Sequence, residues 1–491
     1  MKNETGSPNI IYILADDMGY GDLSCLNENS KIHTPNFDRL ADSGMAFTDA
    51  HASSAVCTPS RYSVLTGRYN WRSRLKHHVL GGYSPSLIEQ DRLTVADMLR
   101  EKGYKTACIG KWHLGLNWGT TGSFVEEPGY RDSKGIDFSA PIKGGPCDHG
   151  FDYYFGISAS LDMPPYVYIE NEKVTQLPDH ETESPDIMRF WRLGPTAPDF
   201  KHEQVLPKVT EKALDIIEKW ADKPFFLYFP LPAPHAPILP IGEFVGKSKT
   251  NSYGDFVLMC DDVVGQVMEK LKQLNLTDNT IVIYTSDNGC SHVADLKALA
   301  QLGHNPSYIF RGHKADIYEG GHRIPLLVSW PGKIQPGSTS AEPVCLIDLM
   351  ATVADIVGYQ LPENAGEDSV SNLPVWLGET YQKPLREATV HHSIDGSFSI
   401  RKGQWKLELC PGSGGWSYPR PGEEPEGSPS FQLYDLDSDI AEKVNVIADH
   451  PEIVEELKAL LTQYITQGRS TPGTPQSNTG PAYWEQLHWM A

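Results

Sequence analysis

The sequence predicts an α/β fold: a large mixed, mostly parallel sheet sandwiched by helices, with a small C-terminal α+β domain. Short apolar segments alternate with amphipathic helical segments over the first 380 residues, which is typical of a sheet covered on both faces. Polar clusters follow directly after several of the apolar segments. Beyond about residue 380 successive strands are followed by one helix, so we expect domains over residues 1–380 and 381–491.

Length and charge limit the class of protein. The chain has 491 residues, enough for two or three domains or for one large and one small domain. Its hydrophobic content of 40% and charged content of 21% are ordinary for a globular protein. The formal net charge of -21 argues against nucleic-acid binding. An anionic ligand would therefore need a local cationic pocket assisted by a metal ion.

The strands predicted for the large domain are short apolar runs: 9–14, 104–109, 225–229, 281–285 and 323–330. The helices between them carry apolar residues at helical spacing: 34–44, 95–102, 209–220 and 256–271. Thr94 is typical of a helix start and Gly103 of a helix end. The alternation of the two element types gives the sheet its predicted helical layers.

Four polar clusters lie just beyond the ends of predicted strands. They are Asp16-Asp17, Lys111 with His113, His235, and Asp287-Asn288. The carboxyl ends of parallel strands meet at one edge of a sheet, where ligands bind in open α/β folds. We therefore expect these four segments to converge on a single site.

The C-terminal domain is expected to combine a small sheet with one helix. Its predicted elements are strands 389–400, 404–409 and 431–436, a Pro/Gly-rich loop 411–429 and a helix 451–467. The tail from Gly468 has a loop-like composition. Trp484 and Trp489 are candidates for holding this tail against the domain.

The carboxylates at the predicted sheet edge suggest a metal site. Asp16 and Asp17 repel each other, and a cation between them would offset that cost. Asp287-Asn288-Gly289 adds a third carboxylate and an amide oxygen. Taken alone, each segment is also a common turn or helix-cap sequence. Together they form an all-oxygen set that suits calcium or magnesium rather than zinc.

The cysteines and the N-terminus give information on the cellular compartment of the protein. Eight cysteines are scattered without a CxxC pair, which predicts neither a disulfide scaffold nor a zinc framework. Residues 1–8 lack the apolar core of a signal peptide, and no apolar run reaches the ~18 residues of a membrane span. We expect a periplasmic or secreted protein whose signal has been removed, with a cytoplasmic location as the alternative.

One cysteine stands in a distinctive context. Residues 57–67 (CTPSRYSVLTG) resemble the signature of the formylglycine-dependent type I sulfatases, of the arylsulfatase A type. Without that resemblance, Cys57 would be interpreted as a buried structural cysteine before a helix. Seven further segments are similar to family motifs in the family's order: 9–21 (NIIYILADDMGYG), 34–44 (TPNFDRLADSG), 110–115 (GKWHLG), 150–160 (GFDYYFGISAS), 234–237 (PHAP), 286–289 (SDNG) and 314–325 (KADIYEGGHRIP).

The resemblance implies the fold of the alkaline phosphatase superfamily and hydrolysis of sulfate esters. In the family the cysteine is oxidised to formylglycine, so Cys57 would need a formylglycine-generating or radical maturation enzyme. One hydroxyl of the hydrated aldehyde attacks sulfur, and proton loss from the other ejects sulfate. A calcium ion would polarise the sulfate oxygens. Its implied ligands are Asp16, Asp17, the modified Cys57, Asp287 and Asn288.

The resemblance also implies which side chains hold the sulfate group. Lys111 and Lys314 would bind sulfate oxygens as fixed positive charges. Ser160 would donate to a further sulfate oxygen, and Arg61 would hold the formylglycine hydroxyl.

Proton transfer is assigned by the same resemblance to three residues. Asp287 would act as base toward the nucleophile, and His235 as general acid on the leaving oxygen. His113 would take up the proton when the hemiacetal collapses. The sequence departs from the family at none of these positions.

The leaving-group pocket is the part in which the family varies. The candidates here are residues just before Lys314 and two inserts: His304, Arg311, His313, 117–146 and 161–198. The segment 163–168 (MPPYVY) has the composition of a sugar-stacking loop and equally of a packed surface loop. The expected substrate is a sulfated carbohydrate, such as a glycosaminoglycan fragment or another sulfated galactose or N-acetylgalactosamine unit.

Two other functions are compatible with these motifs. One is a phosphatase or phosphonate monoester hydrolase of the same superfamily. Cys57 argues against it because the phosphatases usually carry serine or threonine and often zinc, although some phosphonate hydrolases use formylglycine. The other is a sulfated-glycan binder without activity, which would result if Cys57 stayed a thiol.

Overall fold

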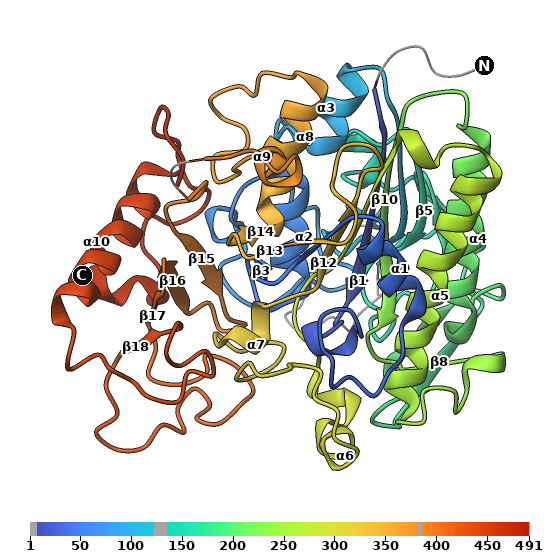
Figure 1. Ribbon diagram of the computed structural model, residues 1–491. Helices are drawn as coiled ribbons and strands as arrows, with labels where there is room; N and C mark the ends of the chain where they lie inside the picture. The colour runs from blue at the N-terminus through green and yellow to red at the C-terminus, as the bar shows by residue number, and fades with distance from the viewer. Residues whose placement is uncertain (1–6, 122–134, 382–383, 491) are drawn as a thin grey trace.

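A central sheet organises the computed structural model, which describes residues 7–121, 135–381 and 384–490 (Figure 1). Five parallel strands form the middle of the sheet: β11 (Thr280–Ser286), β1 (Asn9–Asp16), β10 (Phe225–Pro234), β4 (Lys105–Lys111) and β5 (Tyr153–Ile157). The outer strands are β13 (Ser338–Ser340), β2 (Met45–Phe47), β12 (Leu326–Ser329), β6 (Ile169–Glu170) and β7 (Lys173–Val174). The order across the sheet is β13-β2-β12-β11-β1-β10-β4-β5-β6-β7, and β12 runs antiparallel to β11.

Helices cover both faces of this sheet, as its apolar strands require. Every residue of β1, β10 and β11 is buried, which is typical of strands without a solvent face. The helices of one face are α1 (Pro35–Asp42), α4 (Val205–Lys219) and α5 (Ser252–Gln273), and those of the other are α2 (Cys57–Thr66), α3 (Val95–Glu101) and α8 (Leu349–Val357) (Figure 1). The predicted α/β fold class is confirmed.

Several shorter elements were not predicted. They are β3 (Ala50–His51), β14 (Val344–Cys345), α6 (Leu296–Gln301), α7 (Glu319–His322), α9 (Leu373–Trp376), and a hairpin of β8 (His180–Ser184) and β9 (Trp191–Thr196) within the insert 161–198. The prediction also missed β5, because Gly156 in its middle normally weakens a strand. Here glycine is required, since a Cβ at Gly156 would lie 1.8 Å from the carbonyl oxygen of Gly110 in β4. Residues 122–134 of the insert 117–146 lie outside the described residues.

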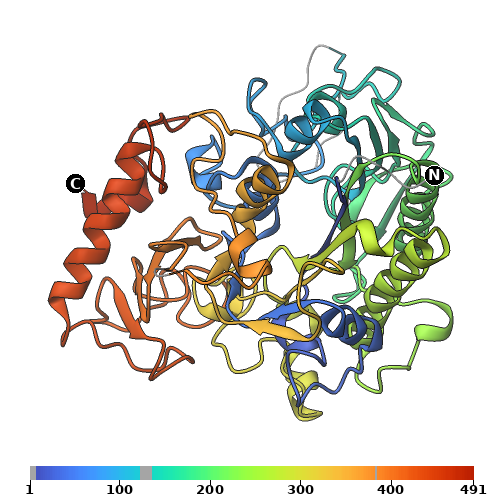
Figure 2. The ribbon, with the colours of Figure 1, turned by 45° about the horizontal axis from the view of Figure 1, so that its top comes forward.

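The C-terminal part is an antiparallel sheet with one helix packed on it, at the orange and red end of the chain in Figure 2. Its elements are β15 (Thr389–His392), β16 (Phe398–Lys402), β17 (Trp405–Glu408), β18 (Gln432–Asp435) and α10 (Pro451–Gln467). The single strand predicted over 389–400 is wrong, because a turn with Gly396 at a φ of 89° divides it into β15 and β16. The strand predicted over 323–330 is likewise shorter, since only β12 joins the sheet.

The small sheet shares its core with the large part of the chain. One cluster joins buried side chains from both: Tyr69, Trp71, Val390, Phe398 and Leu407. Trp484 belongs to the same cluster, and the ring of Trp489 packs edge-on against Phe398 at 5.5 Å. These two contacts hold the tail, as the sequence predicts. The boundary between residues 380 and 381 stays a prediction.

Two predictions about the chain as a whole concern membranes and disulfides. Among the described helices, none is long and apolar enough to cross a membrane. All eight cysteines carry free thiols, so the two parts of the chain are joined by packing and polar contacts.

Candidate active site

The parallel strands bring the predicted polar clusters together at one edge of the sheet. Lys111 Nζ, at the end of β4, lies 2.6 Å from Asp16 Oδ2 at the end of β1 and 2.6 Å from Ser160 Oγ after β5. The backbone N–H of Asp17 donates to Asp287 Oδ1 after β11 at 3.2 Å. His235, which follows β10, places Nε2 3.7 Å from Asp17 Oδ2. Five strand ends therefore contribute to a single site.

Buried oxygen atoms without partners mark the place for a cation. Asp16 Oδ1 and Asn288 Oδ1 have no hydrogen-bond partner in the described part of the chain. Asn288 turns its amide nitrogen to Asp17 Oδ1 at 2.8 Å, which leaves its own oxygen free. Unpartnered buried oxygens are costly unless a positive charge satisfies them. Ligand atoms of Asp16, Asp17, Cys57 and His235 lie within 4.8 Å of one another. The carboxylate oxygens of Asp16 and Asp17, with the free amide oxygen of Asn288, are the donors that fit a hard divalent cation.

Three cationic side chains balance the three carboxylates of this site. Arg61 donates through Nε and Nη2 to Asp287 Oδ2 at 2.9 and 2.7 Å. Lys314 Nζ lies 2.6 Å from Asp17 Oδ1. Burial opposes the charge of Lys314, but Asp17 raises its pKa above the ordinary range. The site can therefore receive an anionic group even though the whole chain is strongly acidic.

Cys57 occupies the first turn of α2, close to these cations. Val56 before it is extended, and Gly67 ends the helix with a φ of 62°. The Cys57 thiol is buried, and Lys314 Nζ lies 3.6 Å from its Sγ. Burial raises the pKa of this thiol to about 11. The unmodified cysteine is therefore protonated at neutral pH and is a weak nucleophile.

His113 is held as a neutral base. Its Nε2 lies 2.7 Å from the carbonyl oxygen of Leu80, which only accepts hydrogen bonds, so Nε2 carries the hydrogen. Its Nδ1 is buried and has no hydrogen-bond partner among the residues that the structure describes. Burial, reinforced by Lys111, lowers the pKa of His113 well below its ordinary value. The lone pair on Nδ1 is thus available to take up a proton.

The comparisons with known proteins agree with this geometry. The family model described as Sulfatase matches residues 8–359. This chain belongs to the sulfatase family. A second model, the C-terminal region of N-sulphoglucosamine sulphohydrolase, matches residues 312–409. The predicted sulfatase family and sulfuric ester hydrolase activity are confirmed.

Relatives of this sulfatase match nearly its whole length. An N-acetylgalactosamine-6-O-sulfatase from Bacteroides thetaiotaomicron is 37% identical over 94% of this chain and 93% of its own. The human N-acetylgalactosamine-6-sulfatase is 29% identical over 98% of this chain and 89% of its own. A solved structure of a Bacteroides thetaiotaomicron protein of glycosaminoglycan metabolism has a TM-score of 0.81 and 36% identity, covering 94% of this chain and 99% of that one. The phosphonate monoester hydrolase of Agrobacterium radiobacter, at a TM-score of 0.59 and 18% identity, covers 93% of this chain and 96% of its own and shares the fold.

The residues predicted to bind the leaving group lie in different surroundings. His304 is buried in the sulfatase, with Nε2 2.9 Å from Asp22 Oδ1 and Nδ1 accepting from the Lys31 backbone at 3.3 Å. Both of its ring nitrogens are therefore used within the protein. Arg311 donates to the backbone oxygen of Glu442 at 2.6 Å and so faces the C-terminal part.

Of these predicted residues, His313 borders the site. It directly precedes Lys314, and its side chain is 14% exposed. Two neighbouring rings were missed by the sequence analysis. The centroid of His292 lies 5.8 Å from that of His313 and 5.0 Å from that of Trp416. Trp416 comes from the loop predicted over 411–429, and nothing in the strand pattern indicates that this loop reaches the sheet edge.

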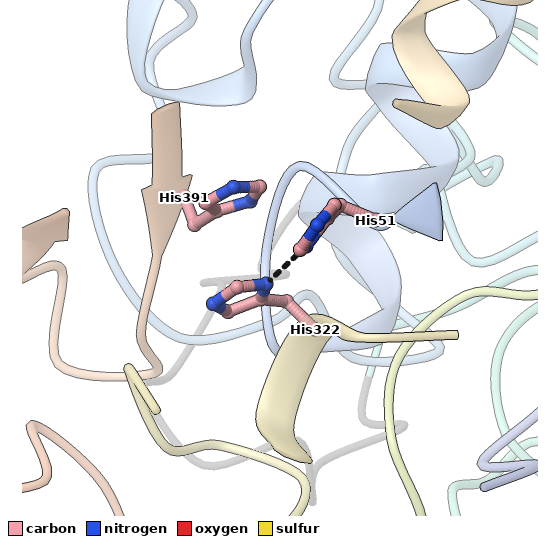
Figure 3. Close-up of side chains that lie close together, drawn as sticks. All are labelled: His51, His322 and His391. Carbon is pink, nitrogen blue, oxygen red and sulfur yellow. Dashed lines mark hydrogen bonds between the residues drawn. The ribbon is translucent and has the colours of Figure 1, made fainter. Parts of the chain in front are cut away.

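A second group of potential metal ligands lies apart from this site. Figure 3 shows His51 of β3, His322 of α7 and His391 of β15 side by side. His51 Nδ1 lies 3.0 Å from His322 Nδ1, whereas the rings of His322 and His391 stack at 3.9 Å with an angle of 3°. The lone pairs of two stacked parallel rings do not point at one ion. His51 also contacts Asp49, and His391 the carbonyl oxygen of Ala52, so we assign these residues to the packing of the two parts of the chain.

Proposed function

We propose that this sulfatase removes the 6-O-sulfate ester from N-acetylgalactosamine or a related galactose unit of a sulfated glycan. The support for this substrate is the similarity to N-acetylgalactosamine-6-O-sulfatases, which extends over 94% of the chain for the bacterial relative. The observation that carries the sulfate chemistry is the buried cluster of Asp16, Asp17, Cys57 and His235 between two lysine ammonium groups. This arrangement offers a metal site beside fixed cations, as an anionic ester requires.

Calcium is the proposed cofactor. Its ligands would be the residues at the ends of β1 and β11 together with residue 57: Asp16, Asp17, Asp287, Asn288 and modified Cys57. The buried oxygens of Asp16 and Asn288 that accept no hydrogen bond support this assignment, although Arg61 Nη2 lies 3.6 Å from that Asp16 oxygen. When bound, the ion would polarise the sulfate oxygens and lower the pKa of the attacking hydroxyl.

We further propose that a maturation enzyme converts Cys57 to formylglycine. The high pKa of the buried thiol supports a role for the modified residue rather than for the thiol itself. When present, the hydrated aldehyde supplies one hydroxyl for attack on sulfur and a second whose proton loss releases sulfate. Arg61 of α2 would hold this group, because two hydrogen bonds to Asp287 fix its guanidinium.

The remaining roles follow from where each side chain is held. Lys111 and Lys314 carry charges at fixed positions for the sulfate oxygens, and Ser160 is within hydrogen-bond distance of Lys111. His235 directs Nδ1 to the carbonyl oxygen of Ala236, which leaves Nε2 to protonate the leaving oxygen. His113 would take up the proton on its free Nδ1. Asp287 would accept the proton of the nucleophile.

Two measurements on one preparation test the proposed function. Mass spectrometry of the peptide that contains residue 57 should show a loss of about 18 Da, which is the change from cysteine to formylglycine. Sulfate release from N-acetylgalactosamine 6-sulfate in calcium should follow the modified fraction, with the 4-sulfate isomer as the control for position. Faster cleavage of a phosphonate monoester would favour the phosphonate hydrolase instead. A thiol at residue 57, with glycan binding but no turnover, would favour the binder.

The periplasmic or secreted location also stays a proposal. Fractionation of the source cells, with the modified peptide traced in each fraction, would test it.

A further inference from the structure

The candidate active site reaches solvent beside His235 and Lys314. The side chain of His235 is 11% exposed and that of Lys314 is 7% exposed. The side chains behind them are fully buried: Asp16, Arg61, Lys111 and Asp287. A sulfate group bound at the lysines must therefore leave its alcohol part on the side of His235 and Lys314.

Three rings form a row of contacts that begins at His313, the residue before Lys314. His313 precedes Lys314 in the chain, and the exposed His292 lies beside it. The half-buried indole of Trp416 meets the His292 ring edge-on, at 5.0 Å and 87°. Trp416 comes from the C-terminal part of the chain, whereas the two histidines come from the large part.

The loop that carries Trp416 is fixed to the segment that carries Lys314. The backbone N–H groups of Trp416 and Ser417 both donate to Asp316 Oδ1, at 2.7 and 2.9 Å. The backbone of Ile317 donates to Ser413 at 2.7 Å. Gly415 allows this approach, because a Cβ there would lie 2.4 Å from the carbonyl oxygen of Ala315. The backbone at Trp416 therefore keeps a set position relative to the segment that carries Lys314.

We propose that Trp416 is a substrate-binding residue, on whose indole the sugar ring of the sulfated substrate stacks while its sulfate group sits at Lys314. The inference rests on the proposed function, since it requires a carbohydrate sulfate. A galactose-type ring has an axial hydroxyl at carbon 4 and so presents a continuous patch of C–H groups on one face. An aromatic ring is the usual protein surface for such an apolar patch beside a few placed polar groups. The small domain thereby completes the substrate site of the large one.

Competition experiments on the modified enzyme test this role. Hydrolysis of a small aryl sulfate is the reporter, and inhibition constants are measured for N-acetylgalactosamine 6-sulfate and for inorganic sulfate. In Trp416→Ala the constant for the sugar sulfate should rise about tenfold, which corresponds to the loss of one aromatic stacking contact. The constant for inorganic sulfate should stay within about twofold, because the lysines and the cation site are untouched. Trp416→Phe should keep most of the sugar affinity.

The matched control is Tyr418→Ala, which removes a 67% exposed aromatic from the same loop and should change neither constant. An equal rise of both constants in Trp416→Ala would mean that the residue only supports the loop, and would overturn the proposal. An unchanged constant for the sugar sulfate would overturn it as well. Failure of the proposed function has a different signature, since the wild-type enzyme would then release no sulfate from N-acetylgalactosamine 6-sulfate.

Discussion

The tautomer of His113 has a direct kinetic consequence. The His113 Nε2–H donates to the carbonyl oxygen of Leu80. Of the two ring nitrogens, Nδ1 is therefore the one left to take up a proton. If His113 acts when sulfate is expelled, His113→Ala should release one equivalent of alcohol and then turn over about 100-fold or more slowly. A rapid-quench measurement of the burst checks this. The control is His180→Ala at an exposed position. Loss of the burst itself would mean that His113 acts in the earlier step, in which the alcohol is released.

Asp17 is the residue at which calcium binding is most simply tested. Its carboxylate faces Lys314, His235 and the amide of Asn288, so its charge is central to the site. Calcium at 100 times its dissociation constant should stabilise the wild-type fold by about 2.7 kcal/mol. Asp17→Asn should abolish this increase in Tm together with the activity.

The comparison for this experiment is Asp278→Asn, which removes an exposed carboxylate. This variant should keep the calcium response in scanning calorimetry. If a calcium chelator changes neither the Tm nor the activity of the wild-type protein, the cation assignment is wrong.

At the scale of elements, the end of β11 must pass very close to α7. The backbone N–H of Gly289 donates to Gly321 at 2.9 Å, and a Cβ at Gly289 would lie 1.9 Å from the carbonyl oxygen of Gly320. Gly289→Ala should therefore move Asp287 and Asn288 away from the strand end of β1. We expect a loss of about 1–3 kcal/mol in the free energy of unfolding and a large drop in kcat/KM.

Urea unfolding and steady-state kinetics on the purified variant check this expectation. The control is Gly332→Ala, where φ is 73° but an added Cβ meets no atom within 4 Å. It should show the backbone strain alone and keep its activity. Unchanged stability and activity in Gly289→Ala would mean that the close approach to α7 does not matter.

At the scale of the whole molecule, buried polar groups join the two parts of the chain. The cluster of His51, His322 and His391 lies at one end of this network. Lys406 of β17 contacts His322 Nε2 at 3.2 Å and forms ion pairs with Glu442 at 2.6 Å, Glu319 at 3.2 Å and Glu408 at 3.3 Å. The other groups that face the histidines are Asp49, Arg323 and Arg401. A proton added to a histidine here would meet several positive charges.

This network predicts that acid destabilises the molecule. Burial lowers the pKa of His51 to about 3 and those of His322 and His391 well below 6.5. The unfolded chain binds these protons first, so the stabilisation is complete above pH 6.5 and is lost as the pH falls toward the folded-state values. Each such histidine should lower the free energy of unfolding by about 1.4 kcal/mol per pH unit below its unfolded pKa.

Denaturant titrations between pH 6.5 and 4.5 measure this slope. His322→Gln should reduce it by the contribution of one histidine, whereas the exposed His180→Gln should leave it unchanged. Burial raises the pKa of Glu408, which opposes the slope, but this effect is common to both proteins and cancels in the comparison. An identical slope in His322→Gln would show that His322 is already charged in the folded state.

The success of the sequence prediction depended on local signals. The apolar runs before Asp16 and Asp287 predicted strands because a strand covered on both faces has no polar positions. The edge where these residues meet followed from the parallel arrangement of the strands. The pattern failed for β5, where only the neighbouring Gly110 explains Gly156, and for the turn at Gly396.

The sequence by itself determined the α/β class, the segments that meet at the sheet edge and the sulfatase family, because each depends on local periodicity or on a contiguous motif. Only the tertiary structure decided that His304 is enclosed by Asp22 and Lys31, and that the backbone of Trp416 is bonded to Asp316, two residues after Lys314. Such contacts join residues far apart in the chain, and their partners are set by how two layers pack. The spacing of apolar and polar residues does not predict contacts between distant segments. The leaving-group side of this site could therefore be found only in the folded molecule.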